Sequence, residues 1–346
     1  MQTLLDPAIL FFVFGAAAGL VRSNLEIPQP IARFLSLYLL MALGLKGGFA
    51  LAQSGLTREV GVSLACAVLL AVVIPAIGYS ILRRWLSGFD AAAVAATYGS
   101  VSAVTFITAV QVLDGRGVVH GGHMAAAMAL MESPAIIMAV LLANMLRRQQ
   151  AAALSAVGAK PGSADAASAA GLASAGAGPV PPLPIGKVLH ESFTDGAQLL
   201  LLGAMAVGLA TGEAGQAAMK TFSGDLFKGM LAFFLLDMGL LTARHLHTLS
   251  GMPRLLLVWG LLAPLAHAGL ALGLAAATQM SVGNAALLMV LAASASYIAV
   301  PAVLRHAVPE AQPALYFGLS LGVTFPFNIL LGIPLYIAVA QWALGS

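Results

Sequence analysis

Charged residues are scarce in this chain of 346 residues: only 8% are Asp, Glu, Lys or Arg, whereas 60% are hydrophobic. A soluble domain carries about 25% charged residues, so the composition excludes an ordinary soluble protein. The mean hydropathy is +0.96. Apolar runs long enough to cross a hydrocarbon core of about 30 Å recur along the sequence and predict a polytopic membrane protein. The net charge is only +3, and we expect no nucleic-acid partner.

Cysteine and the usual enzyme motifs are also missing. Cys66 is the only cysteine, which excludes an intrachain disulfide and a cysteine-based zinc site. We find no Gly-x-Ser-x-Gly and no phosphate-binding loop. His120 and His123 are three positions apart and lack the intervening Glu of a helical zinc protease. The sequence therefore disfavours an intramembrane enzyme and predicts neither a cofactor nor a transition metal.

Ten apolar segments predict an all-α fold with ten transmembrane helices. Their predicted ranges are 8–21, 31–52, 60–82, 91–113, 120–146, 187–211, 222–243, 254–278, 284–304 and 311–343. Residues 149–185, between the fifth and sixth segments, are almost entirely Ala, Gly, Ser and Pro and predict a disordered linker. The linker divides the chain into two five-helix units, 1–148 and 186–346. Pro326 and Pro334 lie inside the last segment, so it is either one helix or two shorter pieces.

The basic residues are distributed unevenly between the two predicted sides of the membrane. Four lie opposite the linker: Arg58, Arg116, Lys220 and Lys228. Eleven lie on the linker side: Arg22, Arg33, Arg83, Arg84, Arg147, Arg148, Lys160, Lys187, Arg244, Arg254 and Arg305. By the positive-inside rule this asymmetry predicts a cytoplasmic linker. Both termini are then expected to be periplasmic or extracellular, in a bacterial inner (plasma) membrane.

The two halves share a pattern of small and hydroxyl residues. The pairs Ser100/Ser102 and Ser294/Ser296 interrupt the fourth and ninth segments and are 194 positions apart. Other matching stretches, 39–45 with 235–241 and 132–134 with 324–326, have similar offsets of 196 and 192. Since five segments is an odd number, the second half must enter the membrane inverted. Inverted repeats with helices broken near the midplane are typical of secondary transporters.

A helix break at each serine pair would create an anion site. The first N–H groups of the helix after the break point into the gap, and two such positive helix ends favour a small oxyanion, with serine hydroxyls as further donors. The alternative is that small residues only allow close helix packing. The repetition of the pattern in both halves favours a site.

Four ionisable residues lie at predicted membrane depth, where charge is costly and usually functional. We expect Glu132, which precedes a proline beside the first break, to coordinate a cation. For Asp237 we expect one of two roles, a second cation ligand or the partner of a basic group. Lys46 is close enough to a predicted helix end to extend its ammonium group to the interface. His267 is expected to hydrogen-bond the carbonyl freed by Pro264.

An ordered series of short segments runs along essentially the whole chain: 44–48, 101–105, 133–144, 226–229, 238–239, 263–267, 292–294 and 333–341. This series resembles the sodium-dependent bicarbonate transporter family, first known from cyanobacterial carbon-concentrating systems. It implies inverted repeats arranged as core and gate domains, a homotrimer, and sodium-coupled uptake of bicarbonate. It also implies a small cytoplasmic PII-like regulatory protein as a partner.

The residue pattern and the resemblance together predict two overlapping sets of site residues, and the resemblance itself implies Ser100, Ser102, Thr105, Ser294, Ser296 and Glu132. The substrate set is Ser100, Ser102, Ala103, Thr105, Ser294, Ser296 and Tyr297. The cation set, for sodium as the coupling ion, is Glu132, Ser102, Thr105, Ser294, Thr324 and Asp237.

The sequence departs from the family at two positions that follow the second serine pair. Tyr297 stands where the cyanobacterial members carry an acidic residue, and Ala299 where they carry a hydroxyl. Loss of a carboxylate removes an oxygen ligand suited to a small cation. Sodium- or proton-coupled transport of another small carboxylate therefore remains an alternative. A membrane sensor of the same fold, which binds its ligand without moving it, is a third hypothesis.

Overall fold

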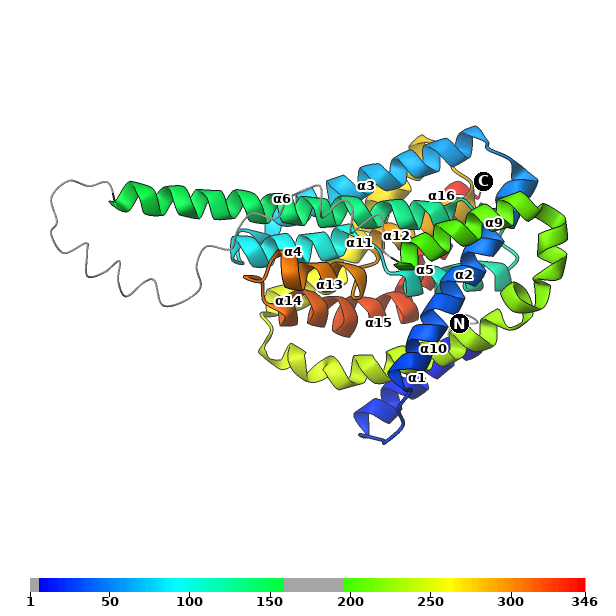
Figure 1. The fold of residues 1–346 in the computed structure, drawn as a ribbon, viewed down its shortest axis with the longest axis horizontal. Helices are drawn as coiled ribbons and strands as arrows, with labels where there is room; N and C mark the ends of the chain where they lie inside the picture. Colours follow the sequence, from blue (N-terminus) through cyan, green and yellow to red (C-terminus); the bar gives the residue numbers. More distant parts are fainter. Residues whose placement is uncertain (1–5, 159–195, 346) are drawn as a thin grey trace.

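The computed structural model describes residues 6–158 and 196–345, and within these ranges every regular element is a helix (Figure 1). The first half contains α1 (Pro7–Leu20), α2 (Gln29–Ser54), α3 (Arg58–Leu82), α4 (Gly88–Gly99), α5 (Ala103–Gly115) and α6 (Met124–Gly158). The second half begins with α9 (Gly196–Ala218), the π-helical turn η2 (Thr221–Asp225), α10 (Phe227–His245), the 3-10 turn η3 (Leu246–Gly251) and α11 (Arg254–Ala277). It ends with α12 (Val282–Ala293), α13 (Ala299–Ala307), α14 (Pro313–Leu319), η4 (Ser320–Thr324), α15 (Phe325–Phe327), η5 (Asn328–Gly332) and α16 (Ile333–Leu344).

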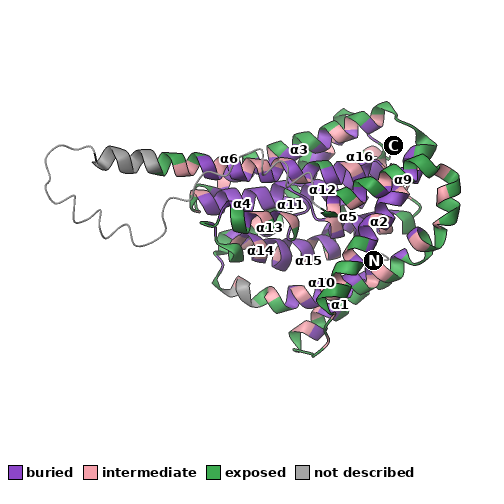
Figure 2. Cartoon of the chain, in the orientation of Figure 1, coloured by how far each residue is buried: buried purple, intermediate pink, exposed green. Residues whose placement is uncertain are grey.

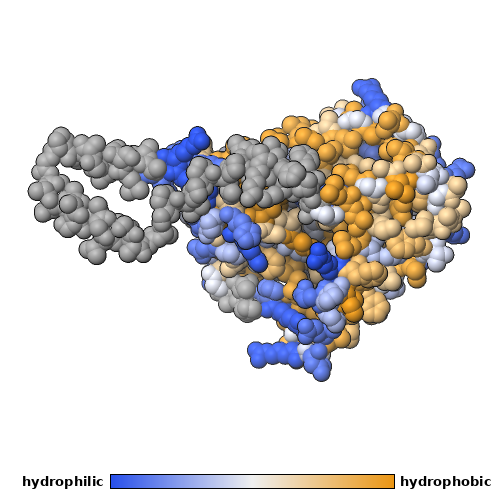
Figure 3. Space-filling view, viewed as in Figure 1, coloured by the Kyte–Doolittle hydropathy of each residue, from blue (hydrophilic) through white to orange (hydrophobic). Residues whose placement is uncertain are grey.

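The described part of the chain contains eight helical segments that are long and apolar enough to cross a membrane. Two more apolar helices, α1 and α12, are shorter. Apolar side chains cover the middle of the face in Figure 3, and hydrophilic ones gather toward its ends. The prediction of an all-α polytopic membrane protein is confirmed.

The helix ends define two opposite faces of the molecule. At the linker end, where α6 finishes, α13 also ends and α4 and α14 begin; there Asp90 of α4 accepts a hydrogen bond from the backbone N–H of Gln312, at 2.7 Å. At the opposite end, which we call the loop end, α5 and α11 finish and α3 and α12 begin. Glu59 of α3 accepts a hydrogen bond from Asn284 of α12 there, at 2.8 Å.

The predicted segments agree with the helices to within a few residues, except at the linker and at the sixth segment, where α9 continues to Ala218 although we predicted an end at 211; residues 187–195 lie outside the described part of the chain. Helix α6 continues to Gly158, so residues 149–158 are helical, whereas we predicted the linker to start at 149; Ala151–Ala153 are good helix formers and extend the helix. The rest of the predicted linker, 159–185, lies outside the described residues. The last segment is one continuous helix, in which the π-helical turns η4 and η5 accommodate the two prolines.

Two pairs of helices pack closely at glycine residues. Helix α1 packs along α10, and α2 packs along α9. A Cβ added at Gly15 would collide with the backbone oxygen of Leu236, and one added at Gly48 with that of Met205. Going along α2 from Gly44 to Gly48, the nearest residues of α9 move from Leu201 to Leu209, so the two helices run parallel.

The same kind of contact shows that α1 and α10 run parallel. The neighbours of α1 on α10 advance from Leu236 at Gly15 to Ala243 at Gly19. The remaining helices form a second group, in which α3 packs on α4 and α6, and α11 packs on α12. The short helices α4 and α12 lie at the centre of this group and are buried almost throughout (Figure 2).

One arginine joins the linker ends of α6 and α13. Arg147 donates from Nε and Nη2 to the two carboxylate oxygens of Glu310, at 2.7 and 2.8 Å. Its Nη2 also donates to the backbone oxygen of Ala307, at 2.9 Å. The hydrogen bond from Arg147 holds the pKa of Glu310 below its usual value.

We expect Arg147→Gln to lower the free energy of unfolding by on the order of 1 to 2 kcal/mol, because charge-assisted hydrogen bonds are lost at a partly solvated carboxylate. With its pKa lowered by folding, Glu310 stabilises the protein above an ordinary carboxyl pKa of about 4.3. This contribution is lost as the pH falls through the lowered value. Melting temperatures measured in detergent at a series of pH values should converge for the wild type and the variant as the pH falls below about 4. Exposed Arg148, changed to Gln, is the control; an equal loss from both variants would contradict the assignment.

Candidate functional site

The first helix break contains two serines, one after α4 and one before α5. Helix α4 ends at Gly99 and α5 begins at Ala103, with an extended backbone at both Ser100 and Ser102. The hydroxyl of Ser102 caps α5: it accepts hydrogen bonds from the backbone N–H and the hydroxyl of Thr105, at 3.3 and 3.0 Å. The hydroxyl of Ser100 is buried and has no hydrogen-bond partner.

The second break repeats this arrangement in the other half. Helix α12 ends at Ala293, and the chain is non-helical until α13 begins at Ala299. Ser294 takes the place that Ser100 has in the first break, as the residue that follows the helix. The hydroxyl of Ser296, two positions before the N-cap residue Ile298, accepts a hydrogen bond from the backbone N–H of Val300 in the first turn of α13, at 3.3 Å.

The two breaks are hydrogen-bonded to each other. The backbone N–H of Ser102 donates to the hydroxyl oxygen of Ser294, at 3.0 Å. In return, the backbone N–H of Ser296 donates to the carbonyl oxygen of Thr97, at 2.9 Å. Backbone groups freed by a helix break must find partners inside a membrane protein, and here each break supplies them to the other. Residues 192 positions apart in the sequence thus form one unit.

A cavity of about 230 Å³ lies beside this unit, between α2 and α9 on one side and α5, α6 and α13 on the other. Its polar lining comes from Ser36, Ser102, Glu132, Gln198, Ser296 and Tyr297. Ala103 and Val104, in the first turn of α5, and Ala299, in the first turn of α13, also line it. Two helix N-termini with their partial positive charge therefore face one cavity. Its volume is several times the share of one water, roughly 30 Å³, and suits a small anion with some hydration.

Glu132 is the only carboxylate among the described residues that line this cavity. It is half-buried on α6 and accepts a hydrogen bond from Nε2 of Gln198 on α9, at 2.7 Å. This contact joins α6 to α9 across the cavity. Gln198 was missed in the sequence, although a lone amide just before the apolar run 199–209 is a usable signal.

Tyr297 occupies part of the space beside the breaks. Its ring is buried and packs on Phe325, with the ring centroids 5.0 Å apart. Its hydroxyl lies near Ser102 and donates to Sδ of Met238 on α10, at 3.7 Å. The tyrosine thus links the second break to a helix of the other group.

Among the predicted cation ligands, Thr324 and Asp237 belong neither to the cavity lining nor to the hydrogen-bonded unit of the breaks. Thr324 is 2.5 Å from the hydroxyl of Tyr98, and its hydroxyl donates to the carbonyl oxygen of Gly260, at 2.8 Å. Asp237 is half-buried on α10, next to Met238. Of the other predicted residues, Thr105 and Ser294 are buried within the hydrogen-bonded unit of the breaks.

One expectation for a single residue is corrected. The carbonyl freed by Pro264 is that of Gly260, and Thr324 satisfies it; His267 instead hydrogen-bonds the backbone of Ala292, because its ring lies toward the end of α12. The partly exposed ammonium group of Lys46 pairs with Asp114 at 3.1 Å.

The fold and this site define a class: a polytopic helical membrane protein with a polar cavity at two joined helix breaks. None of the curated proteins compared with the chain matched it. The family model of the Na+-dependent bicarbonate transporter superfamily matches residues 7–341, and the chain belongs to this superfamily. The resemblance seen in the sequence is therefore confirmed.

Proposed function

We propose that this chain is a secondary active transporter that takes up bicarbonate together with sodium by alternating access. The observation that carries the proposal is the cavity at the joined breaks, into which the first turns of α5 and α13 both face. Membership of the superfamily supplies the substrate and the coupling ion. In this proposal the anion binds the exposed N–H groups of these turns and the hydroxyls of Ser102 and Ser296.

The directions of the long helices support an inverted repeat of two five-helix units. By order in the chain, α9 corresponds to α1 and α10 to α2. Helices α1 and α2 follow each other through the short connection 21–28 and run in opposite directions. Because α9 runs parallel to α2, it runs opposite to its counterpart α1. Counting α4 with α5, α12 with α13, and the run α14 to α16 as single spans gives ten crossings.

The two helix groups support a division into gate and core. The gate consists of α1, α2, α9 and α10, packed as two parallel pairs. The core consists of α3 to α6 and α11 to α16 and holds both breaks. The cavity lies between the two groups, so a movement of the core against the gate exposes the site to each side in turn.

Sodium is proposed to bind among the oxygen atoms nearest the breaks. Hard cations prefer oxygen ligands. The unpartnered hydroxyl of Ser100, the hydroxyls of Thr105 and Ser294, and the carboxylate of Glu132 provide such oxygens. We retain Asp237 and Thr324 in the proposal only as ligands in another conformation, because neither lines the cavity here.

Placement in the cell follows from charge and family. Nine of the eleven basic residues assigned to the linker side are described, and Arg83, Arg147 and Arg305 lie near the linker ends of their helices. This supports a cytoplasmic linker end and a loop end that faces the periplasm of a bacterial inner membrane. A homotrimer and a PII-like regulatory partner remain proposals taken from the resemblance.

Uptake of labelled bicarbonate into proteoliposomes, with and without an inward sodium gradient, tests the function. We expect accumulation that requires the gradient. Protein that is folded and inserted yet gives no uptake at any sodium concentration would overturn the proposal.

One observation favours a second candidate, transport of another small carboxylate. Tyr297 replaces an acidic residue beside the break, and the cavity wall includes apolar groups such as Leu40 and Val303. These groups suit an anion with a short apolar part, whereas bicarbonate has none. Competition of unlabelled short-chain carboxylates against bicarbonate uptake distinguishes the candidates, since a bicarbonate transporter is expected to resist them.

A further inference from the structure

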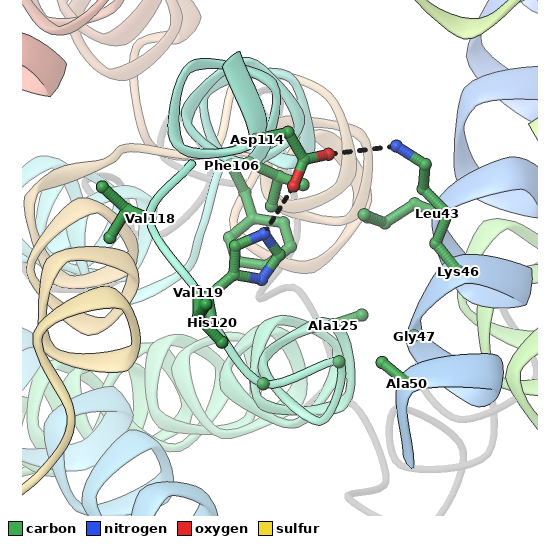
Figure 4. A pocket seen from close by; sticks show the side chains of 13 residues that line it. Leu43, Lys46, Gly47, Ala50, Phe106, Asp114, Val118, Val119, His120 and Ala125 are labelled. Carbon is green, nitrogen blue, oxygen red and sulfur yellow. Dashed lines mark hydrogen bonds and ion pairs between the residues drawn. The ribbon is translucent and has the colours of Figure 1, made fainter. Parts of the chain in front are cut away.

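A second cavity, of about 290 Å³, opens at the loop end (Figure 4). Leu43, Lys46 and Ala50 of α2 line one side, and Phe106, Val110 and Asp114 of α5 line the other, with Ala125 of α6 and residues 118–122 completing it. It therefore lies between a gate helix and two core helices. The cavity at the breaks uses the same three helices: Ser36 and Leu40 of α2, Ala103 and Val104 of α5, and Met128 to Ile136 of α6.

The two cavities are in line and are separated by a thin apolar layer. The lining of one ends at Leu40 on α2 and that of the other begins at Leu43; on α5 the corresponding residues are Val104 and Phe106. Three helical residues span about 4.5 Å. Leu43, Phe106 and Met128 are all buried, at 3%, 1% and 4% exposure, and form this layer. Only about one helical turn thus closes the loop-end path to the site.

An ion pair crosses the mouth of the loop-end cavity. The ammonium group of Lys46 lies 3.1 Å from one carboxylate oxygen of Asp114, and Nε2 of His120 lies 3.0 Å from the other (Figure 4). Lys46 also lies over the ring of Phe227 at the start of α10, 4.6 Å from its centroid. The lysine is therefore held by gate residues and reaches a carboxylate of the core.

The loop that carries His120 belongs to the core. The backbone N–H of Gly121 donates to Asn284 of α12, at 2.6 Å, and Asn284 donates to Glu59 of α3, at 2.8 Å. A Cβ at Gly122 would collide with the carbonyl oxygen of Gly47, so the loop packs directly on α2. If the core moves against the gate, the loop and Asp114 move together and the bond to Lys46 breaks.

We propose that Lys46, Asp114 and His120 form a latch between gate and core at the loop end. When the latch breaks, the thin layer at Leu43 and Phe106 opens and connects the loop-end cavity with the cavity at the breaks. The inference rests on the alternating access proposed above. An exposed ion pair contributes little to folding stability. A bias of that size still changes the populations several-fold when two conformations differ little in free energy. His120 positions the carboxylate by occupying its second oxygen.

Cysteine labelling tests the latch without measuring transport. Cys66 is buried and is replaced first, by Ala. Ala129→Cys then reports access to the cavity at the breaks, and Ala50→Cys, which lines the loop-end cavity, identifies the side on which that cavity opens. A membrane-impermeant maleimide is added to sided vesicles from the side that labels Ala50→Cys.

We expect Lys46→Met and Asp114→Asn each to raise the labelling rate of Ala129→Cys about fivefold, equivalent to about 1 kcal/mol of population shift. The exchange Lys46→Asp with Asp114→Lys should restore slow labelling. Unchanged labelling in both single variants, with Ala50→Cys labelled normally, would overturn the latch. Since no substrate is used, an error in the substrate or coupling ion leaves this result unaffected.

Discussion

Replacing one serine of each break, Ser102→Leu together with Ser296→Leu, is expected to reduce uptake to background. Each serine hydroxyl accepts a hydrogen bond from the first turn of the helix that follows its break, from Thr105 in one half and Val300 in the other. Both side chains also line the cavity. Leucine removes these acceptors, leaves buried N–H groups without partners at a cost of about 1 to 3 kcal/mol each, and fills the space of the anion. Uptake of labelled anion into proteoliposomes is the measurement.

The double variant needs a control for the effect of leucine itself. Ser80 is an exposed serine on α3 that hydrogen-bonds only the carbonyl oxygen of Ala76 within its own helix. Ser80→Leu should retain uptake, because its side chain faces outward from the helix group. Size-exclusion profiles of both variants should match the wild type. Wild-type uptake by a folded double variant would contradict the site at the breaks.

The positions of the breaks were predictable, but their mutual contact was not. Small and hydroxyl residues inside an apolar segment indicate where a helix ends, and Ser100 and Ser294 do follow helix ends. The bond between Ser102 and Ser294 depends on how two halves of the chain pack, which no local pattern contains. The sequence thus predicts both breaks, and packing alone makes one site of them.

Ionisable residues in the membrane show the same limit. Glu132 was predicted to face the site because of its place beside a proline, and it does line the cavity. Its partner Gln198 follows the linker and is 66 positions away, so only the tertiary structure reveals the pair. Asp237 has the same apolar surroundings in the sequence, yet no residue of its helix α10 is among those that line the cavity. The packing of whole helices therefore decides between these outcomes.

Glu132→Gln is expected to weaken sodium dependence more than it weakens anion binding. The substitution keeps the size of the side chain and its acceptor oxygen for Gln198 but removes the negative charge. A sodium ion near the breaks loses its nearest carboxylate, whereas the anion loses a repulsive neighbour. We expect the sodium concentration for half-maximal uptake to rise about tenfold, equivalent to about 1.4 kcal/mol, with a smaller change in the bicarbonate concentration for half-maximal uptake.

The matched comparison is Gln198→Glu, which adds a carboxylate on the opposite wall of the same cavity. Combined with Glu132→Gln, it exchanges the two groups and keeps the number of charges. If charge in the cavity recruits sodium, the exchanged protein should recover part of the sodium dependence that Glu132→Gln loses. If Glu132 only fixes α6 against α9, Glu132→Gln should lower the melting temperature and leave the sodium concentration for half-maximal uptake unchanged. The two roles therefore differ in a measurable quantity, and a carboxylate at membrane depth that serves packing alone would incur a desolvation cost without a compensating ion.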